Sequence, residues 1–252
     1  FNAVGAAGGK VTTSSPLATA SELAHQLRDS STSTVVTLPA FRETVEAAAE
    51  QAGCVKEVVY IGEESGKFLF EDRGIAAKTI DTFKPEDCFA LPYSSGTTGL
   101  PKGTMLSHRN LVANVQQIVQ HPEHNLDMSE SDVVLGLLPA YHIYAMTVVC
   151  QAALRKGASV VMLPKFEPQS FLEVMQKYGV SWAPLVPPLI LFLAKHPVVD
   201  SADLSKLRVI FSGAAPLDAG TQSAVEKRLG VSVRQGYGMT ENLAVSHITE
   251  PG

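Results

Sequence analysis

The second half of the chain alternates short apolar runs with amphipathic segments, which predicts strands and helices in turn. Apolar runs of strand length occur at 132–138, 158–163, 180–185, 207–211 and 231–235. Segments of helix length occur at 145–156, 168–178, 187–195 and 218–229. Strands joined through helices pair in parallel by right-handed crossovers. The pattern therefore predicts an α/β fold with a doubly wound, largely parallel sheet and flanking helices.

The first half of the chain shows the same alternation less regularly. Ser21 is placed to cap a helix in which Leu23 and Leu27 share one face. A strand, a helix and a second strand are then predicted at 34–38, 42–51 and 57–61. The charged stretch 63–84 contains several glycines and is typical of a connection.

Composition and charge narrow the class of protein. The 252 residues are 45% hydrophobic, enough for a large core. The net charge of −5 argues against nucleic acid as a partner, and no apolar run approaches the roughly 18 residues of a membrane span. Cys54, Cys88 and Cys150 are scattered and form no CxxC pair. A reducing compartment, and thus a cytoplasmic location, is expected, with a peroxisomal location left open.

The segment 93–103 (YSSGTTGLPKG) concentrates groups that bind phosphate. Glycines allow backbone N–H groups to converge on an anion, hydroxyls add donors, and a lysine adds positive charge. The candidate ligands are Ser94, Ser95, Gly96, Thr97, Thr98, Gly99 and Lys102. A flexible linker is the plain alternative, but it would need neither Lys102 nor the apolar residues before Tyr93. The Walker and GxGxxG patterns both fail to match here.

This segment resembles the phosphate-binding loop of the adenylate-forming superfamily, which includes acyl-CoA synthetases, 4-coumarate–CoA ligases, beetle luciferases and peptide-synthetase adenylation domains. Three further segments fit the same resemblance in the order that the family uses: 138–144 (LPAYHIY), 212–216 (SGAAP) and 235–241 (QGYGMTE). The stretches 163–166 and 186–188 are most similar to the 4-coumarate–CoA ligase branch and its fatty-acyl relatives.

The resemblance implies roles for individual residues. Contacts to ATP are implied for the phosphate-loop residues Ser94 to Gly99 and Lys102, and for Ala214, Ala215, Gln235, Gly236, Tyr237, Gly238 and Thr240. Contacts to the carboxylic acid substrate are implied for His142, Tyr144, Gly213 and Met239. Lys102, His142, Thr240 and Glu241 would take part in catalysis, Glu241 as the Mg²⁺ ligand, and Lys165 would contact coenzyme A.

Three of these residues follow predicted strands directly. His142, Gly213 and Tyr237 each lie just beyond the carboxyl end of an apolar run. Ligands of open α/β sheets bind at that edge, so we expect these residues to line one crevice. Without that context, a histidine beside a tyrosine is more often a packing residue, and Lys165 could equally be a surface lysine.

The implied activity is that of an ATP-dependent carboxylic acid–CoA ligase, which forms an acyl-adenylate and then a thioester. The small acid itself stays open between cinnamate-like and medium-chain fatty acids. A non-catalytic ATP- or AMP-binding module and a luciferase-like adenylating oxygenase are the alternatives. A hydrolase is disfavoured because the chain has no GxSxG elbow.

The resemblance also implies an incomplete large domain. Residues 1–252 would be part of the AMP-binding large domain, with lobes 1–92 and 130–252 joined by the phosphate-loop region 93–129. In the family a hinge and a small C-terminal domain with a catalytic lysine follow, and only eleven residues remain after Glu241. We therefore expect the small domain to be absent and the fragment to be unable to complete catalysis.

Overall fold

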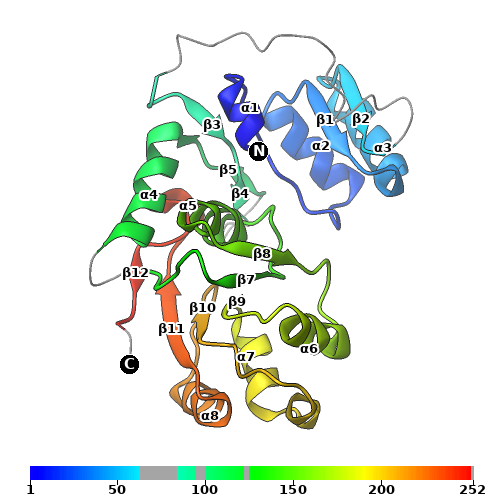
Figure 1. The fold of residues 1–252 in the computed structure, drawn as a ribbon. Helices are drawn as coiled ribbons and strands as arrows, with labels where there is room; N and C mark the ends of the chain where they lie inside the picture. Colours follow the sequence, from blue (N-terminus) through cyan, green and yellow to red (C-terminus); the bar gives the residue numbers. More distant parts are fainter. Residues whose placement is uncertain (63–83, 95–99, 122–124, 251–252) are drawn as a thin grey trace. The chain divides into compact units, whose positions relative to one another are not determined.

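The computed structural model describes residues 1–62, 84–94, 100–121 and 125–250. These residues form two compact units, Phe1–His108 and Arg109–Gly252 (Figure 1). The boundary falls inside the region 93–129 that was expected to join two lobes. The connection predicted at 63–84 lies, apart from Lys84, outside the described residues. No helix in the described part of the chain is long and apolar enough to cross a membrane.

The first unit contains a small parallel sheet and short strands that pair antiparallel. Its elements are α1 (Asn2–Ala6), α2 (Ala20–Asp29), β1 (Thr34–Thr37), a 3₁₀ turn (Pro39–Phe41), α3 (Arg42–Ala52), β2 (Glu57–Tyr60), β3 (Cys88–Ala90), β4 (Tyr93–Ser94), β5 (Lys102–Gly103) and β6 (Leu106–Ser107). Strands β1 and β2 pair in parallel, and α2 packs on α3 through Leu23, Leu27, Val45 and Ala48. The shared apolar face predicted for Leu23 and Leu27 is thus confirmed.

The cap of α2 differs from the prediction. Thr19, not Ser21, is the N-cap, and Ser21 lies in the first turn of the helix. The Thr19 hydroxyl accepts a hydrogen bond from the Glu22 amide (3.3 Å), and the Glu22 carboxylate accepts one from the Thr19 amide (2.8 Å). This reciprocal pair needs a Glu or Gln three residues after the cap. Thr19 has that partner, whereas Ser21 is followed at that spacing by Ala24.

The second unit is built on a six-stranded sheet (Figure 1). Its elements are α4 (His108–Gln120, whose first residue ends the first unit), β7 (Val133–Gly136), a π-helix (Ala145–Ala152), α5 (Ala153–Lys156), β8 (Ser159–Met162), α6 (Pro168–Lys177), β9 (Trp182–Leu185), α7 (Pro187–Lys195), a 3₁₀ helix (Pro197–Ser201), β10 (Val209–Ser212), α8 (Ala219–Leu229), β11 (Ser232–Tyr237), a 3₁₀ turn (Thr240–Asn242) and β12 (His247–Ile248). Each strand and helix predicted between 132 and 235 is present, with ends that differ by no more than two residues.

The strand order is β12-β11-β10-β9-β7-β8, and every pair is parallel except β11 with β12. The order in which strands are added therefore reverses at β7: β8 is added on one side of it, and β9 and the strands that follow are added on the other. This reversal is the topological switch of a doubly wound sheet, and ligands bind beyond the carboxyl ends of strands at such a switch. The predicted fold class is confirmed.

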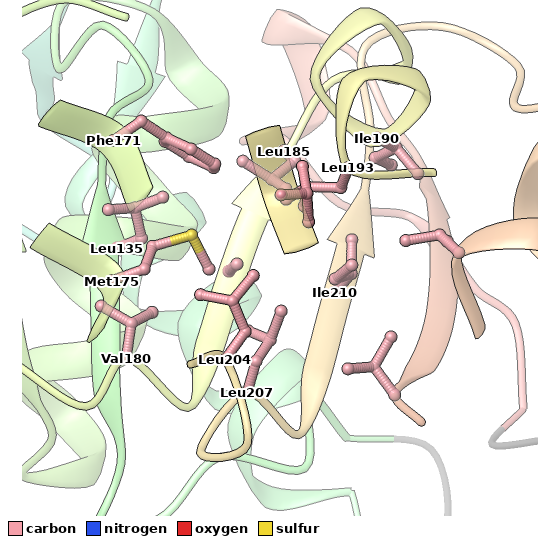
Figure 2. Close-up of a cluster of buried hydrophobic side chains, with 14 of the residues drawn as sticks. Leu135, Phe171, Met175, Val180, Leu185, Ile190, Leu193, Leu204, Leu207 and Ile210 are labelled. Atoms are coloured by element: carbon pink, nitrogen blue, oxygen red, sulfur yellow. The ribbon is translucent and has the colours of Figure 1, made fainter. Parts of the chain in front are cut away.

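The main core lies between the sheet and the helices α6, α7 and α8. Alternate strand residues such as Leu135, Leu185 and Ile210 point into it, where they meet Phe171 and Met175 of α6 (Figure 2). Intervening strand residues point to the opposite face of the sheet. There the rings of Trp182 and Phe211 stack with centroids 5.6 Å apart. Burial on both faces explains why these strands are continuous apolar runs.

The helix predicted at 145–156 is present but begins as a π-helix. Ala145–Ala152 is π-helical, and only Ala153–Lys156 is α-helical. Residues 145–149 are all buried, so this segment has no polar face whose period could have revealed the wider turn. The π-helix contacts β7 and β9, opposite the main core. Such segments are rare and are frequently found at functional sites.

A buried carboxylate ties three strands together at their amino ends. Asp132 precedes β7, and its carboxylate accepts hydrogen bonds from the Ser181 hydroxyl (2.7 Å) and the Ser129 amide (2.8 Å). Arg208, next to β10, lies 3.1 Å from the same carboxylate. Burial alone raises the pKa of Asp132, but the hydrogen bonds from Ser181 and Ser129 and the charge of Arg208 lower it overall.

We predict that Asp132→Asn destabilises the chain by about 1.5–3 kcal/mol at neutral pH, because it weakens hydrogen bonds to a charged buried group. The pKa of Asp132 is lower in the folded state, so its contribution is present above about pH 4 and is lost as pH falls through the folded value. Urea unfolding at several pH values measures this. The control is Asp200→Asn. Asp200 is exposed and forms an ion pair with Arg228, so this substitution should lower the free energy of unfolding by less than about 1 kcal/mol. Equal effects of the two variants would contradict the assignment.

Candidate functional site

The predicted phosphate loop is the end of a β-hairpin in the first unit. Strands β4 and β5 pair antiparallel, with Tyr93 opposite Gly103 and Ser94 opposite Lys102. Residues opposite each other in an antiparallel pair share one face, so the Ser94 hydroxyl and the Lys102 ammonium belong to the same face of this stem. The other predicted ligands, Ser95, Gly96, Thr97, Thr98 and Gly99, lie outside the described residues.

In the second unit, three predicted segments extend from one edge of the sheet. The stretch containing His142 follows β7, Gly213 follows β10, and Tyr237 ends β11. Because β7, β9, β10 and β11 run in parallel, their carboxyl ends meet at this edge. Lys165 follows β8 at the same edge, where it is exposed and pairs with Glu167 at 2.7 Å. The hydrogen bond that Lys165 donates to the Glu167 carboxylate raises the pKa of Lys165.

Tyr144 is a packing residue of this edge. Its side chain is buried, and its hydroxyl donates to the Phe211 carbonyl at 2.7 Å. Burial raises the pKa of Tyr144 well above its ordinary value. A β-carbon at Gly213 would lie 2.8 Å from the Tyr144 ring, so the backbone after β10 can approach only because residue 213 is glycine. Tyr144 therefore fixes the position of Gly213, and its contact with an acyl group stays a prediction.

His142 is exposed at the start of the π-helical region, and its hydrogen bond determines which ring nitrogen carries the proton. Its Nδ1 accepts a hydrogen bond from the Tyr144 amide at 3.3 Å. Burial of part of the ring lowers the pKa of His142, which favours the neutral form. A neutral ring whose Nδ1 is an acceptor carries its proton on Nε2. His142 can therefore donate a hydrogen bond to an oxygen atom of a ligand.

The loop after β10 carries the predicted adenine contacts Ala214 and Ala215. Both are exposed, and Ala214 has a left-handed backbone (φ 70°). Gln235 of β11 holds this loop, because its Oε1 accepts from the Leu217 amide (3.3 Å). Its Nε2 donates to Gln222 of α8 (2.9 Å). In this arrangement the Gln235 side chain supports the loop, and its predicted contact with nucleotide stays a prediction.

The turn between β11 and β12 is closed tightly around Gly238. A β-carbon at this position would overlap the carbonyl oxygen of Ala244, and Leu243 and Ala244 both have positive φ values (64° and 91°). The Met239 amide donates to the Asn242 side chain at 3.1 Å. This backbone leaves no space for a side chain at position 238, which explains why the segment 235–241 has a glycine there.

The same turn exposes side chains suited to a nucleotide. Tyr237 is 61% exposed and Met239 is 44% exposed, although both adjoin the central sheet. Thr240 and Glu241 lie in the 3₁₀ turn, and Glu241 is exposed. Among the described residues, no group of three or more His, Cys, Asp or Glu side chains could hold a metal ion on its own. Any ion here would need oxygen atoms from a ligand.

Sequence reasoning missed Asn114, which supports this turn from α4. Asn114 is buried, and its Nδ2 donates to the Val245 carbonyl at 2.7 Å. In α4, Asn114 belongs to the same buried stripe as Val115, Ile118 and Val119. A polar side chain in an apolar stripe requires a hydrogen-bond partner, and this was the available signal.

Comparison with known proteins defines the class of the chain. The AMP-binding enzyme family matches residues 1–252, so the chain belongs to that family of adenylate-forming enzymes. It is 41% identical over 240 residues to 4-coumarate–CoA ligase 5 of Oryza sativa subsp. japonica, covering 93% of this chain and 44% of that protein. It is 39% identical to 4-coumarate–CoA ligase 1 of Arabidopsis thaliana, covering 96% of this chain and 45% of that protein.

Solved structures agree with this assignment. The fold matches ATP-bound MatB from Rhodopseudomonas palustris with a TM-score of 0.81 and 30% identity, covering 98% of this chain and 48% of that one. It matches a red-emitting luciferase from Phrixothrix hirtus with a TM-score of 0.81 and 26% identity, covering 96% and 48%. The chain thus spans about half the length of the relatives that it matches.

We predict that Gly238→Ala destabilises the second unit by about 3 kcal/mol, the upper end of the usual cost of overpacking, because the new methyl group has no space beside Ala244. Thermal unfolding of the purified chain measures this. Gly220→Ala is the matched control: it lies in the first turn of α8, where the nearest atom to a β-carbon is a side-chain oxygen of Asp218 at 3.1 Å and not a backbone atom. If the two variants unfold at the same temperature, the geometry of the turn is not what excludes a side chain at 238.

Proposed function

We propose that this chain is the nucleotide-binding part of an ATP-dependent carboxylic acid–CoA ligase similar to the 4-coumarate–CoA ligases. A carboxylate attacks the α-phosphorus of ATP to give an acyl-adenylate and pyrophosphate, and the thiol of coenzyme A then displaces AMP. The observation that carries the proposal is the turn after β11, which excludes a side chain at Gly238 and leaves Tyr237 and Glu241 exposed at the carboxyl edge of the sheet.

The adenine ring and the α-phosphate are assigned to residues of this edge. Tyr237 would stack on adenine, since a ring that is mostly exposed beside a buried sheet offers an apolar face without rearrangement. Ala214 and Ala215 have small side chains, which let the base lie close to the loop backbone. Gly236 and Gly238 let the turn pack closely against the Phe211 ring and the Ala244 carbonyl, and they would contact the nucleotide through their backbone. The Thr240 hydroxyl would donate to the α-phosphate.

The β- and γ-phosphates are assigned to the hairpin between β4 and β5. Lys102 and Ser94 stand opposite each other on its stem, and the loop residues Ser95–Gly99 would add hydroxyl and amide donors. Negative charge accumulates on the phosphate oxygens as the α-phosphorus is attacked. Donors and a cation that are fixed before the reaction stabilise that charge without reorganising.

Mg²⁺ fits the residues of the turn. This ion is usually bound through one or two protein carboxylates, with phosphate oxygens and water completing the shell. Glu241 is an exposed carboxylate beside Thr240, the residue assigned to the α-phosphate, and can serve as that ligand. The bound ion would neutralise charge on the phosphates during adenylation.

The acid would bind near the π-helical region. His142 would donate from Nε2 to a carboxylate oxygen, while Gly213 and Met239 would line the acyl site above the packed Tyr144 ring. The named relatives act on 4-coumarate, so a cinnamate-like aromatic acid is the substrate class we propose.

Lys165 would contact coenzyme A. Because Cys54, Cys88 and Cys150 are free thiols, we place the reaction in the reducing cytoplasm.

We predict that the protein carrying this chain exchanges pyrophosphate into ATP in the presence of its acid. Lys102→Ala and Glu241→Ala should each lower that exchange at least about 100-fold, the size of effect expected when a group that stabilises transition-state charge is removed. Isotope exchange at saturating acid measures this.

Lys165→Ala provides a matched lysine control. It should leave exchange unchanged and slow only the formation of the thioester, because coenzyme A takes no part in adenylation. Full exchange activity in Lys102→Ala would contradict the assignment of the β- and γ-phosphates to Lys102. Exchange without thioester formation in the unmodified protein would favour a luciferase-like oxygenase, and nucleotide binding without exchange would favour a non-catalytic module.

A further inference from the structure

The stem of the hairpin formed by β4 and β5 is hydrogen-bonded to the last turn of α2 within the first unit. The Tyr93 hydroxyl donates to the Asp29 carboxylate at 2.5 Å and lies 3.4 Å from the Gln26 carbonyl. The Tyr93 ring packs against Gly103 of the other strand, where a β-carbon would come within 3.0 Å of the ring. Asp29 of α2 is therefore bonded to a side chain of β4 that also packs against β5.

A second connection runs from the same turn of α2 through a buried hydrogen-bond chain. Gln26 is only 8% exposed, and its Nε2 donates to the Thr12 hydroxyl (2.7 Å) and to the Thr13 carbonyl (3.0 Å). The Thr12 hydroxyl donates in turn to the Leu91 carbonyl (2.7 Å). Leu91 lies two residues before Tyr93, in the segment that joins β3 to β4, so both connections reach the chain where it enters the hairpin.

We propose that Asp29, assisted by Gln26, is a positioning residue for the ATP phosphates: its contact with Tyr93 fixes the stem that holds Ser94 and Lys102 opposite each other. The proposal rests on the function proposed above. None of the four sequence segments that resemble the adenylate-forming family includes either α2 residue.

The physical basis is preorganisation. A stem whose position is fixed beforehand loses less conformational freedom when Ser94 and Lys102 bind a triphosphate, so the loss of the contact with Asp29 weakens ATP binding more than it slows the chemical step. Burial and the neighbouring carboxylate raise the pKa of Tyr93, so the hydroxyl keeps its proton. Asp29 is exposed and packs into no core, so its loss leaves the fold of α2 intact.

The test is the Michaelis constant for ATP in pyrophosphate exchange by the protein that carries this chain. We expect Asp29→Ala to raise this constant about tenfold, equivalent to ~1.4 kcal/mol, while kcat changes by less than about twofold. Asp29→Asn should restore most of the affinity, because the amide oxygen can still accept from Tyr93. In a Tyr93→Phe background, Asp29→Ala should have no further effect, since the contact is already lost.

Thr19→Ala is the matched control. It removes the cap of the same helix, and so lowers the melting temperature without touching the hairpin. The Michaelis constant for ATP should not change in this variant. A rise equal to that of Asp29→Ala, or additive effects of Asp29→Ala and Tyr93→Phe, would overturn the proposal. Absence of exchange in the unmodified protein would instead overturn the proposed function, and direct binding of ATP–Mg²⁺ to Asp29→Ala would then decide whether the anchor affects nucleotide affinity.

Discussion

The parallel pairing of β7, β9, β10 and β11 is the constraint on which the second unit depends. Apolar residues cover both faces of these strands, so the sheet cannot slip by one residue without moving core side chains to the wrong face. The carboxyl ends of the strands are thereby held at one edge. The loops that carry His142, Gly213 and Tyr237 are far apart in sequence, yet they begin from fixed points at that edge.

Close backbone packing, rather than a network of charges, shapes the loops at this edge. Gly213 admits the Tyr144 ring, and Gly238 admits the Ala244 carbonyl. Supporting polar contacts come from outside the loops, from Gln235 on β11 and Asn114 on α4. The side chains of Tyr237 and Glu241 are exposed at this edge and are accessible to a ligand.

Hydrophobic periodicity predicted the order and type of the elements because the core is built from regular strands and helices. It could not predict contacts between segments far apart in the chain. The cap of α2 was assigned to Ser21 because the reciprocal role of Glu22 was overlooked, although that signal is local. The π-helix and the Asp29–Tyr93 bond depend on tertiary packing and leave no periodic signal. The polar Asn114 in the buried stripe of α4 indicated that a partner was needed, but not that the partner is the Val245 carbonyl.

The π-helix has a consequence for how sequences of this kind can diverge. A π turn holds one residue more than an α turn, so the segment after β7 is equivalent to an α-helix with a single insertion. Deletion of one residue between Ala145 and Ala152 would restore α geometry and rotate everything on its amino-terminal side by about 100°. His142 and Tyr144 would then lose their present orientation, which makes the number of residues here as strictly constrained as their identity.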